Sequence, residues 1–200
     1  MGTMKERILE TSLELFAQRG YEGVSVSDIA GALGLTKGAL YRHFASKRAI
    51  FDSILLRMAR QDGDQARRHD LPQEAFEADE AAYAAATGAH ILAFSKAMFR
   101  YWTEDPFAAA FRRMLTLEQF RSQEMGRLYQ QYLAAGPLGY VADLFQSLGL
   151  PEPRRRAAAF YGPMFLLYSV YDGAEDKSAV TALLDKSLEK AINDLMGGRI

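Results

Sequence analysis

Cysteine is absent from the 200 residues, and histidine, tryptophan and proline are scarce, with three, one and six copies respectively. Without cysteine the chain can form neither disulfides nor thiolate metal sites, and it has no cysteine nucleophile. The histidines, His43, His69 and His90, form no H-E-x-x-H zinc motif, and no G-x-G-x-x-G or phosphate-binding loop occurs. We therefore expect no metal, no cofactor and no enzymatic activity.

Long hydrophobic runs are also missing. The longest apolar stretch, Ala157–Tyr171, is interrupted by Gly162 and Pro163 and is shorter than the ~20 residues needed to cross a bilayer. The N-terminus is charged at residues 5–7 and lacks the apolar core of a signal peptide. Together with the absence of cysteine, this predicts a cytoplasmic protein with no membrane partner.

Charge of one sign does not dominate the chain as a whole, because the formal net charge is −1. The two ends differ, however. Residues 1–60 hold nine Lys and Arg against six Asp and Glu, a net charge of +3, whereas residues 61–200 hold fifteen against nineteen, a net charge of −4. The basic excess favours an N-terminal segment that contacts nucleic acid.

Apolar residues make up 49% of the chain and recur at helical spacing, and no stretch alternates as a strand would. We therefore predict an all-α fold. Gly34 and Gly136-Pro137 are expected to stop helices, and Asp105-Pro106 and Pro153 to open new ones. The expected helices cover residues 5–19, 27–34, 36–44, 46–58, 78–103, 107–120, 124–135, 138–148, 153–171 and 177–196.

One stretch, SDIAGALGLTKGALYRHF, begins at Ser27 and has the pattern of a helix, a tight turn and a second helix. Ser27 is a suitable N-cap for the first helix, Gly34 can end it, and Thr36 can cap the second. On the second helix Leu40 and Phe44 lie four residues apart and face one core. The opposite face is small, then basic and aromatic, which suits a DNA major groove. Two ordinary packed helices would give a similar pattern.

The flanking residues extend this pattern from Gly20 to Phe51. A glycine follows the first helix, D-I-A-x-x-L-G precedes the turn, T-K-G-A-L-Y-x-H-F forms the second helix of the pair, and S-K-x-x-I-F opens the next helix. This run resembles the DNA-binding domain of the tetracycline-repressor (TetR) family of bacterial transcription regulators. The rest of the chain resembles the family only in its length and helical layout.

The resemblance implies a helix-turn-helix DNA-binding domain of three helices over residues 1–50, and a larger helical ligand-binding and dimerisation domain over residues 51–200. A long fourth helix links the two domains in the family, and here it would pass through the polar stretch 57–70. The last two helices carry more apolar surface than one small domain would bury, so we expect a homodimer through a four-helix bundle. The implied function is repression at a palindromic double-stranded DNA operator, relieved by an unknown small-molecule effector.

The resemblance also assigns candidate DNA contacts. Base-edge contacts are expected from Lys37, Gly38, Ala39 and Arg42. Contacts to the sugar-phosphate backbone are expected from Ser27, Thr36, Tyr41, His43 and Lys47. Arg42 stands at a position that is often aromatic in the family, which would alter base preference.

Large, adaptable side chains are frequent in the expected larger domain, and their Tyr hydroxyls and Met thioethers predict a pocket for an apolar or aromatic effector. The candidate lining residues are His90, Phe94, Met98, Trp102, Phe111, Met114, Tyr129, Tyr132, Tyr161, Met164 and Tyr168. Core packing alone also explains any one of them. The alternatives are a non-inducible or architectural DNA-binding protein with a filled core, and a small all-α enzyme or carrier, which would need a buried acid–base pair that the sequence does not show.

Overall fold

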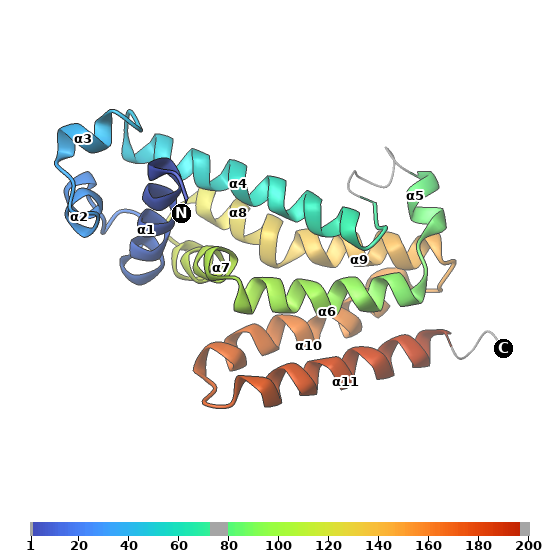
Figure 1. Cartoon of the computed structure of the whole chain (residues 1–200). Coiled ribbons are helices and arrows are strands. Elements are labelled where there is room, and N and C mark those ends of the chain that lie inside the picture. Colours follow the sequence, from blue (N-terminus) through green and yellow to red (C-terminus); the bar gives the residue numbers. More distant parts are fainter. Residues whose placement is uncertain (1, 73–79, 197–200) are drawn as a thin grey trace. The chain divides into compact units, whose positions relative to one another are not determined.

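The computed structural model describes residues 2–72 and 80–196, and the regular elements in these ranges are all α-helices. The all-α prediction is thereby confirmed. The helices, labelled in Figure 1, are α1 (Met4–Arg19), α2 (Val26–Ala32), α3 (Lys37–Tyr41), α4 (Lys47–Arg68), α5 (Glu80–Ala85), α6 (Gly88–Glu104), α7 (Pro106–Glu118), α8 (Gln123–Leu133), α9 (Ala135–Ser147), α10 (Pro153–Gly173) and α11 (Lys177–Met196).

The chain forms two compact units. The N-terminal unit comprises Met1–Gln61 and Pro106–Tyr129, and the C-terminal unit comprises Asp62–Asp105 and Gln130–Ile200. This division differs from the sequence boundary expected at residue 50, because α7 returns to pack on α1 in the N-terminal unit. The polar stretch 57–70 is helical as far as Arg68, so the long fourth helix expected there is present as α4.

The core of the N-terminal unit is built from the apolar stripes of its helices. Tyr21, in the turn after α1, lies with its ring centroid 5.2 Å from that of Phe16 and 5.0 Å from that of Phe51, and so joins α1 to α4. Other fully buried side chains of this unit include Ile8, Leu13, Ile29, Leu40, Ile50, Ile54, Met58, Phe111, Met114 and Leu115.

The first helix of the motif begins at a different cap from the one predicted. Ser25, not Ser27, is the N-cap of α2: its Oγ accepts a hydrogen bond from the Asp28 N–H at 3.2 Å, and the Asp28 carboxylate accepts one from the Ser25 N–H at 2.7 Å. This reciprocal capping box requires an acid three residues after the cap, and Ser27 has Ala30 there. The hydrogen bonds from Ser25 also lower the pKa of Asp28.

The other two predicted caps are confirmed. Thr36 Oγ1 accepts a hydrogen bond from the Ala39 N–H at 3.2 Å, and Ser46 Oγ accepts one from the Ala49 N–H at 3.0 Å. Both are short polar side chains three residues before the amide that they satisfy, which is the spacing of an N-cap and its N3 residue.

Two other helix boundaries differ from the predictions. The single helix expected over 78–103 is divided into α5 and α6 because Thr87 acts as a new N-cap, accepting a hydrogen bond from the His90 N–H at 3.2 Å. Residues 78 and 79 lie outside the described residues. Gly136-Pro137 does not stop a helix: the break lies at Ala134 (φ −128°, ψ −93°), and Pro137 occupies the first turn of α9, where its missing N–H costs nothing.

The C-terminal unit places α10 against α6, α9 and α11, and α11 also contacts α6 (Figure 1). Phe99 of α6 stacks on Tyr168 of α10, with ring centroids 5.3 Å apart and planes 10° apart. Two ion pairs join α6 to α11, one from Arg100 to Asp185 and one from Lys96 to Glu189. Thus the cations of α6 that face α11 are already paired.

Asp62 of α4 is half-buried, and one of its two carboxylate oxygens is fully covered. Its Oδ1 is covered by protein and has no hydrogen-bond partner in the described part of the chain. Burial raises the pKa of Asp62 to about 7, from an ordinary value of 3.8, because the low-dielectric surroundings disfavour the ionised form.

Gly20 gives the first prediction. It has φ +77°, and a Cβ at this position would lie 2.3 Å from Oε1 of Glu118, which is 2% exposed. Gly20→Ala is therefore expected to lower the free energy of unfolding by about 1–3 kcal/mol, measured by urea denaturation. Gly31→Ala is the control: a Cβ there meets nothing within 4 Å, so the change should be neutral or stabilise by up to ~1 kcal/mol. Equal losses in both variants would contradict this reading.

Asp62 gives a pH-dependent prediction. Because its pKa is higher in the folded than in the unfolded protein, the folded state holds a proton that the unfolded state releases between pH 4 and pH 7, and stability falls across this window. Asp62→Asn lacks this loss, so its free energy of unfolding at pH 8 should exceed that of the wild type by about 1–4 kcal/mol. Urea denaturation from pH 4 to pH 8 measures this difference, which should shrink toward pH 4. A difference that does not vary with pH would refute the assignment.

Candidate nucleic-acid interface

The turn between α2 and α3 is fixed by backbone geometry. Gly34 has φ +66°, a conformation that favours glycine, and the Leu35 N–H donates a hydrogen bond to the Ala30 carbonyl at 2.8 Å. Helix α3 ends at Tyr41 and is shorter than the expected 36–44. After it, the His43 and Phe44 N–H groups both donate hydrogen bonds to the Leu40 carbonyl oxygen, at 2.9 and 3.2 Å, so the chain continues as a turn. The inward side chain of α3 is Leu40, which is fully buried.

The predicted DNA contacts lie on or next to α2, α3 and the start of α4. Tyr41 is 48% exposed. The side chains that are exposed to solvent are those of Ser27, Thr36, Lys37, Tyr41 and Arg42, together with Gly38, whereas Ala39, His43 and Lys47 are half-buried.

Lys37 and Arg42 carry the free positive charge of this surface. Neither side chain makes a hydrogen bond, ion pair or ring contact with any residue in the described ranges. Between them, Gly38 has open space where a Cβ would stand, and its φ is not in the left-handed region. Neither packing nor backbone conformation within the protein therefore requires glycine at position 38. Close approach of an external partner is a remaining reason for a residue without a side chain there.

Lys47 is engaged within the protein. Its Nζ donates a hydrogen bond to the Tyr21 carbonyl oxygen at 2.8 Å, lies 4.2 Å from the centroid of the Tyr21 ring and lies 3.5 Å from the Glu22 carboxylate. The side chain is only 20% exposed. Lys47 thus ties the start of α4 to the turn after α1, and any phosphate contact would compete with Glu22 for the same ammonium.

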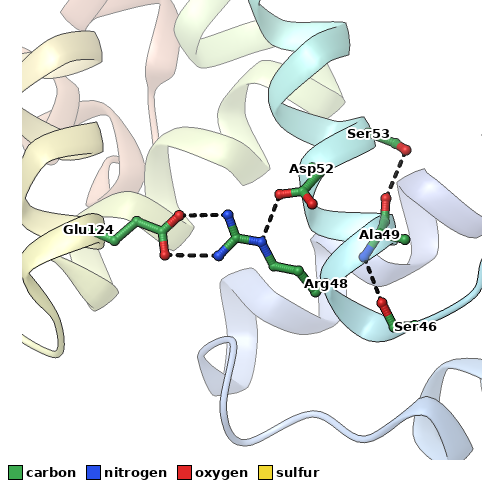
Figure 2. A network of polar contacts seen from close by, with 6 residues as sticks. All are labelled: Ser46, Arg48, Ala49, Asp52, Ser53 and Glu124. Atoms are coloured by element: carbon green, nitrogen blue, oxygen red, sulfur yellow. Dashed lines mark hydrogen bonds and ion pairs between the residues drawn. The ribbon is translucent and has the colours of Figure 1, made fainter.

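Arg48 forms a bridge from α4 to α8, as Figure 2 shows. Its Nη1 and Nη2 donate hydrogen bonds to the two carboxylate oxygens of Glu124 at 2.9 and 2.8 Å, and its Nε donates to Asp52 at 2.7 Å. This bidentate geometry is the strong form of an Arg–carboxylate pair. The hydrogen bond from Arg48 lowers the pKa of Glu124. Sequence analysis missed the bridge because 76 residues separate its partners.

The candidate effector-binding residues are divided between the two compact units. Phe111, Met114 and Tyr129 lie in the N-terminal unit, where the first two are fully buried core residues. The other candidates, all in the C-terminal unit, are His90, Phe94, Met98, Trp102, Tyr132, Tyr161, Met164 and Tyr168. Neither unit by itself gathers all eleven residues.

Within the C-terminal unit, one pair of these side chains makes a ring contact. The rings of Trp102 and Tyr132 lie 6.3 Å apart, and the Tyr161 hydroxyl donates a hydrogen bond to the Leu133 carbonyl oxygen at 2.8 Å. Burial, followed by the charge of Asp62, raises the pKa of Tyr132 to about 12. His90 Nδ1 is covered and has no hydrogen-bond partner among the described residues. The C-terminal unit thus holds two covered polar atoms, Asp62 Oδ1 and His90 Nδ1, without hydrogen-bond partners among the described residues.

A separate surface pocket of about 380 Å³ lies between α9 and the start of α10. It involves none of the candidate residues; its lining is Ala142, Asp143, Gln146, Glu152, Pro153, Arg154 and Arg155. In the ranges 2–72 and 80–196, no cluster of three His, Asp or Glu residues is arranged to hold a metal ion. The described helices also include none that is long and apolar enough to span a membrane.

The N-terminal segment is similar in sequence to known proteins. Residues 8–54 match the family described as bacterial regulatory proteins, tetR family. The uncharacterized HTH-type transcriptional regulator YerO of Bacillus subtilis is 46% identical over 50 residues, which are 25% of this chain and 17% of that protein. The biofilm operon icaADBC HTH-type negative transcriptional regulator IcaR of Staphylococcus aureus is 39% identical over 49 residues, 24% of this chain and 26% of IcaR.

The fold of the whole chain also has known relatives. A transcriptional regulator of Aquifex aeolicus, described as belonging to the TerR/AcrR family, superposes with a TM-score of 0.68 over 94% of this chain and 99% of its own. Its sequence is 20% identical, so the likeness concerns the fold. Residues 8–54 therefore match the tetR family of bacterial regulatory proteins, and the chain as a whole has the fold of that solved regulator.

Proposed function

We propose that this chain is a dimeric transcription repressor that binds a palindromic DNA operator and is released by a small apolar or aromatic molecule. The observation that carries the proposal is the free face of α3. Lys37 and Arg42 hold unpaired positive charge there, Gly38 allows close approach, and Tyr41 is 48% exposed. Phosphate oxygens and purine edges are suitable partners for this surface.

Each side chain receives a role in the complex. Lys37 and Arg42 are long enough to reach base edges, and Gly38 and Ala39 keep the helix close to them. Thr36 accepts a hydrogen bond from the Ala39 N–H, which leaves its O–H to donate to a phosphate. The remaining backbone contacts are assigned to Ser27, Tyr41, His43 and Lys47.

Whether the protein represses or activates transcription is assigned from a similar protein. IcaR is named a negative transcriptional regulator, and its similarity to this chain lies in the matched N-terminal segment. We assign repression to this chain by that similarity. A regulator of bacterial operators works beside the chromosome, so we place the protein in the cytoplasm.

Dimerisation is assigned to α10 and α11. These two helices contact each other, and they leave four large apolar side chains exposed: Phe165 (41%), Leu166 (63%), Val170 (44%) and Leu183 (54%). Such a surface is favourable when a second copy covers it as a four-helix bundle. A twofold dimer would present two α3 helices to half-sites about 34–36 Å apart, or a multiple of this spacing.

The effector is assigned to the C-terminal unit, which holds eight of the eleven candidate residues, including the ring pair of Trp102 and Tyr132. Release from DNA requires that the effector prefer a conformation that fits the operator poorly, because equal affinity for both states shifts nothing. Reversing a strongly biased equilibrium takes about 5.5 kcal/mol of differential binding.

A second candidate function is non-inducible or architectural DNA binding. It is favoured by the close packing of candidate effector residues, since Trp102, Met164 and Tyr168 are 3–5% exposed and Tyr168 stacks on Phe99. Operator affinity that no small molecule changes would favour this alternative.

Arg42 tests the base-edge assignment. Arg42→Ala is expected to weaken operator binding by about 1–3 kcal/mol and to relax preference at one base pair. Tyr41→Phe, which removes only a proposed phosphate contact, should weaken all sequences alike. Fluorescence anisotropy on a panel of operator variants at fixed salt measures both effects. Unchanged discrimination by Arg42→Ala would exclude its role in base recognition.

Leu183 and Leu166 test the dimer. Replacing both with Glu places charge in the proposed interface twice per dimer, so the dissociation constant of the dimer should rise about tenfold or more in sedimentation equilibrium. Leu56→Glu is the control, because Leu56 is 55% exposed but lies on α4 in the N-terminal unit. If the double variant dimerises as the wild type does, the interface lies elsewhere.

Selection from random duplex DNA at physiological salt tests the function as a whole, with the mass of the protein in solution measured in the same buffer. A palindromic site bound by a dimer is the expected result. Binding that is weak, strongly salt-sensitive and independent of sequence would reject the operator assignment.

A further inference from the structure

The first turn of α4 is attached to two other elements of the N-terminal unit. Lys47 donates a hydrogen bond to the Tyr21 carbonyl oxygen at 2.8 Å, and the rings of Tyr21 and Phe51 lie 5.0 Å apart. Arg48 donates hydrogen bonds to both carboxylate oxygens of Glu124, which lies in the first turn of α8 (Figure 2). The start of α4 is thus joined both to the turn after α1 and to the start of α8.

The guanidinium group of Arg48 is engaged within the protein at all three nitrogens. Nη1 and Nη2 donate to Glu124 at 2.9 and 2.8 Å, and Nε donates to Asp52 at 2.7 Å. Two parallel hydrogen bonds between planar groups restrict the direction of the contact as well as its length. Arg48 therefore differs from the unpaired Lys37 and Arg42, because it can fix the place of a helix but is not a free charge for a phosphate.

Residues that are proposed to contact DNA adjoin this first turn of α4. Lys47 directly precedes Arg48, and residues 42–46 connect the end of α3 to α4. Ile50, in the same turn, is fully buried and belongs to the core into which Leu40 anchors α3. A tilt of the start of α4 would therefore displace both the proposed backbone contacts and α3.

We propose that Glu124 is a positioning residue for operator binding, which acts through its bridge to Arg48 and does not touch the DNA. It lies 76 residues beyond Arg48, so a helix from a distant part of the chain completes the DNA-binding surface. This inference rests on the proposed function, in which the N-terminal unit binds an operator, and adds a residue outside the assigned DNA contacts.

Electrostatics and positioning predict opposite effects for the loss of this carboxylate. A negative charge near the DNA-binding surface repels phosphates, so its removal alone would strengthen binding. Glu124→Gln keeps the length of the side chain but loses the charge and one of the two acceptor oxygens, which weakens the bridge. If the bridge positions α4, the variant should bind the operator about three- to tenfold more weakly, although the protein has become more positive.

The variants are compared as full-length proteins by fluorescence anisotropy, at fixed salt, on the operator selected from random duplex DNA. Arg48→Lys keeps the positive charge but cannot form the bidentate pair, so it should weaken binding about as much as Glu124→Gln does. The double variant should be no more than about twofold weaker than either single variant, since both changes break the same bridge. Losses that multiply in the double variant would show that the two residues act separately, and would overturn the proposal.

Glu10→Gln is the matched control. Glu10 belongs to the same unit and accepts one hydrogen bond, at 3.3 Å, from Arg57 farther along α4. This variant should bind the operator as tightly as the wild type or more tightly. Unchanged or tighter binding by Glu124→Gln would overturn the proposal, and so would equal weakening by Glu10→Gln.

Urea denaturation of the same variants separates positioning from a general loss of stability. The side chains of Arg48 and Glu124 are 54% and 39% exposed, and an ion pair with this exposure contributes little to the free energy of unfolding. The midpoints should therefore stay close to that of the wild type. A lower midpoint with unchanged operator affinity would show a purely structural bridge and reject the proposal. Arg48→Lys carries the test if Glu124→Gln does not fold.

The wild type separates this inference from the function on which it rests. If the wild type binds a specific operator and Glu124→Gln binds it equally well, only the positioning role fails. If selection yields no specific site for the wild type, the proposed function fails, and the positioning role fails with it.

Discussion

The nucleic-acid interface depends on the packing of one side chain, Leu40, into the core of the N-terminal unit. Helix α3 has five residues, far fewer than a helix needs to be stable in isolation. Its position must therefore come from its surroundings: the cap of Thr36, the turn at Gly34 and the anchoring of Leu40, which is fully buried. One buried residue and two local signals are enough to position α3. The side chains on its outer face are therefore not needed for packing, and they can be small or charged.

The positive charges of the N-terminal unit also divide into those that hold the structure together and those that do not. Lys47 holds the turn at Tyr21, Arg48 bridges to Glu124, and Arg57 lies 3.9 Å from the centroid of Phe107 and 3.3 Å from Glu10. These three cations join elements of the unit to one another, whereas Lys37 and Arg42 do not. The net charge of +3 over residues 1–60 therefore says less about DNA binding than the distinction between paired and unpaired cations.

Local signals in the sequence predicted most helix boundaries, since Thr36, Ser46, Pro106 and Pro153 act within one turn of the chain. Errors arose where two local signals competed. Ser25 and Ser27 are both good caps, and only the acid at Asp28 decides between them. Contacts between distant residues were beyond reach: the Arg48–Glu124 bridge has no local pattern, and α7 carries Phe111 and Met114 into the unit opposite to the one expected.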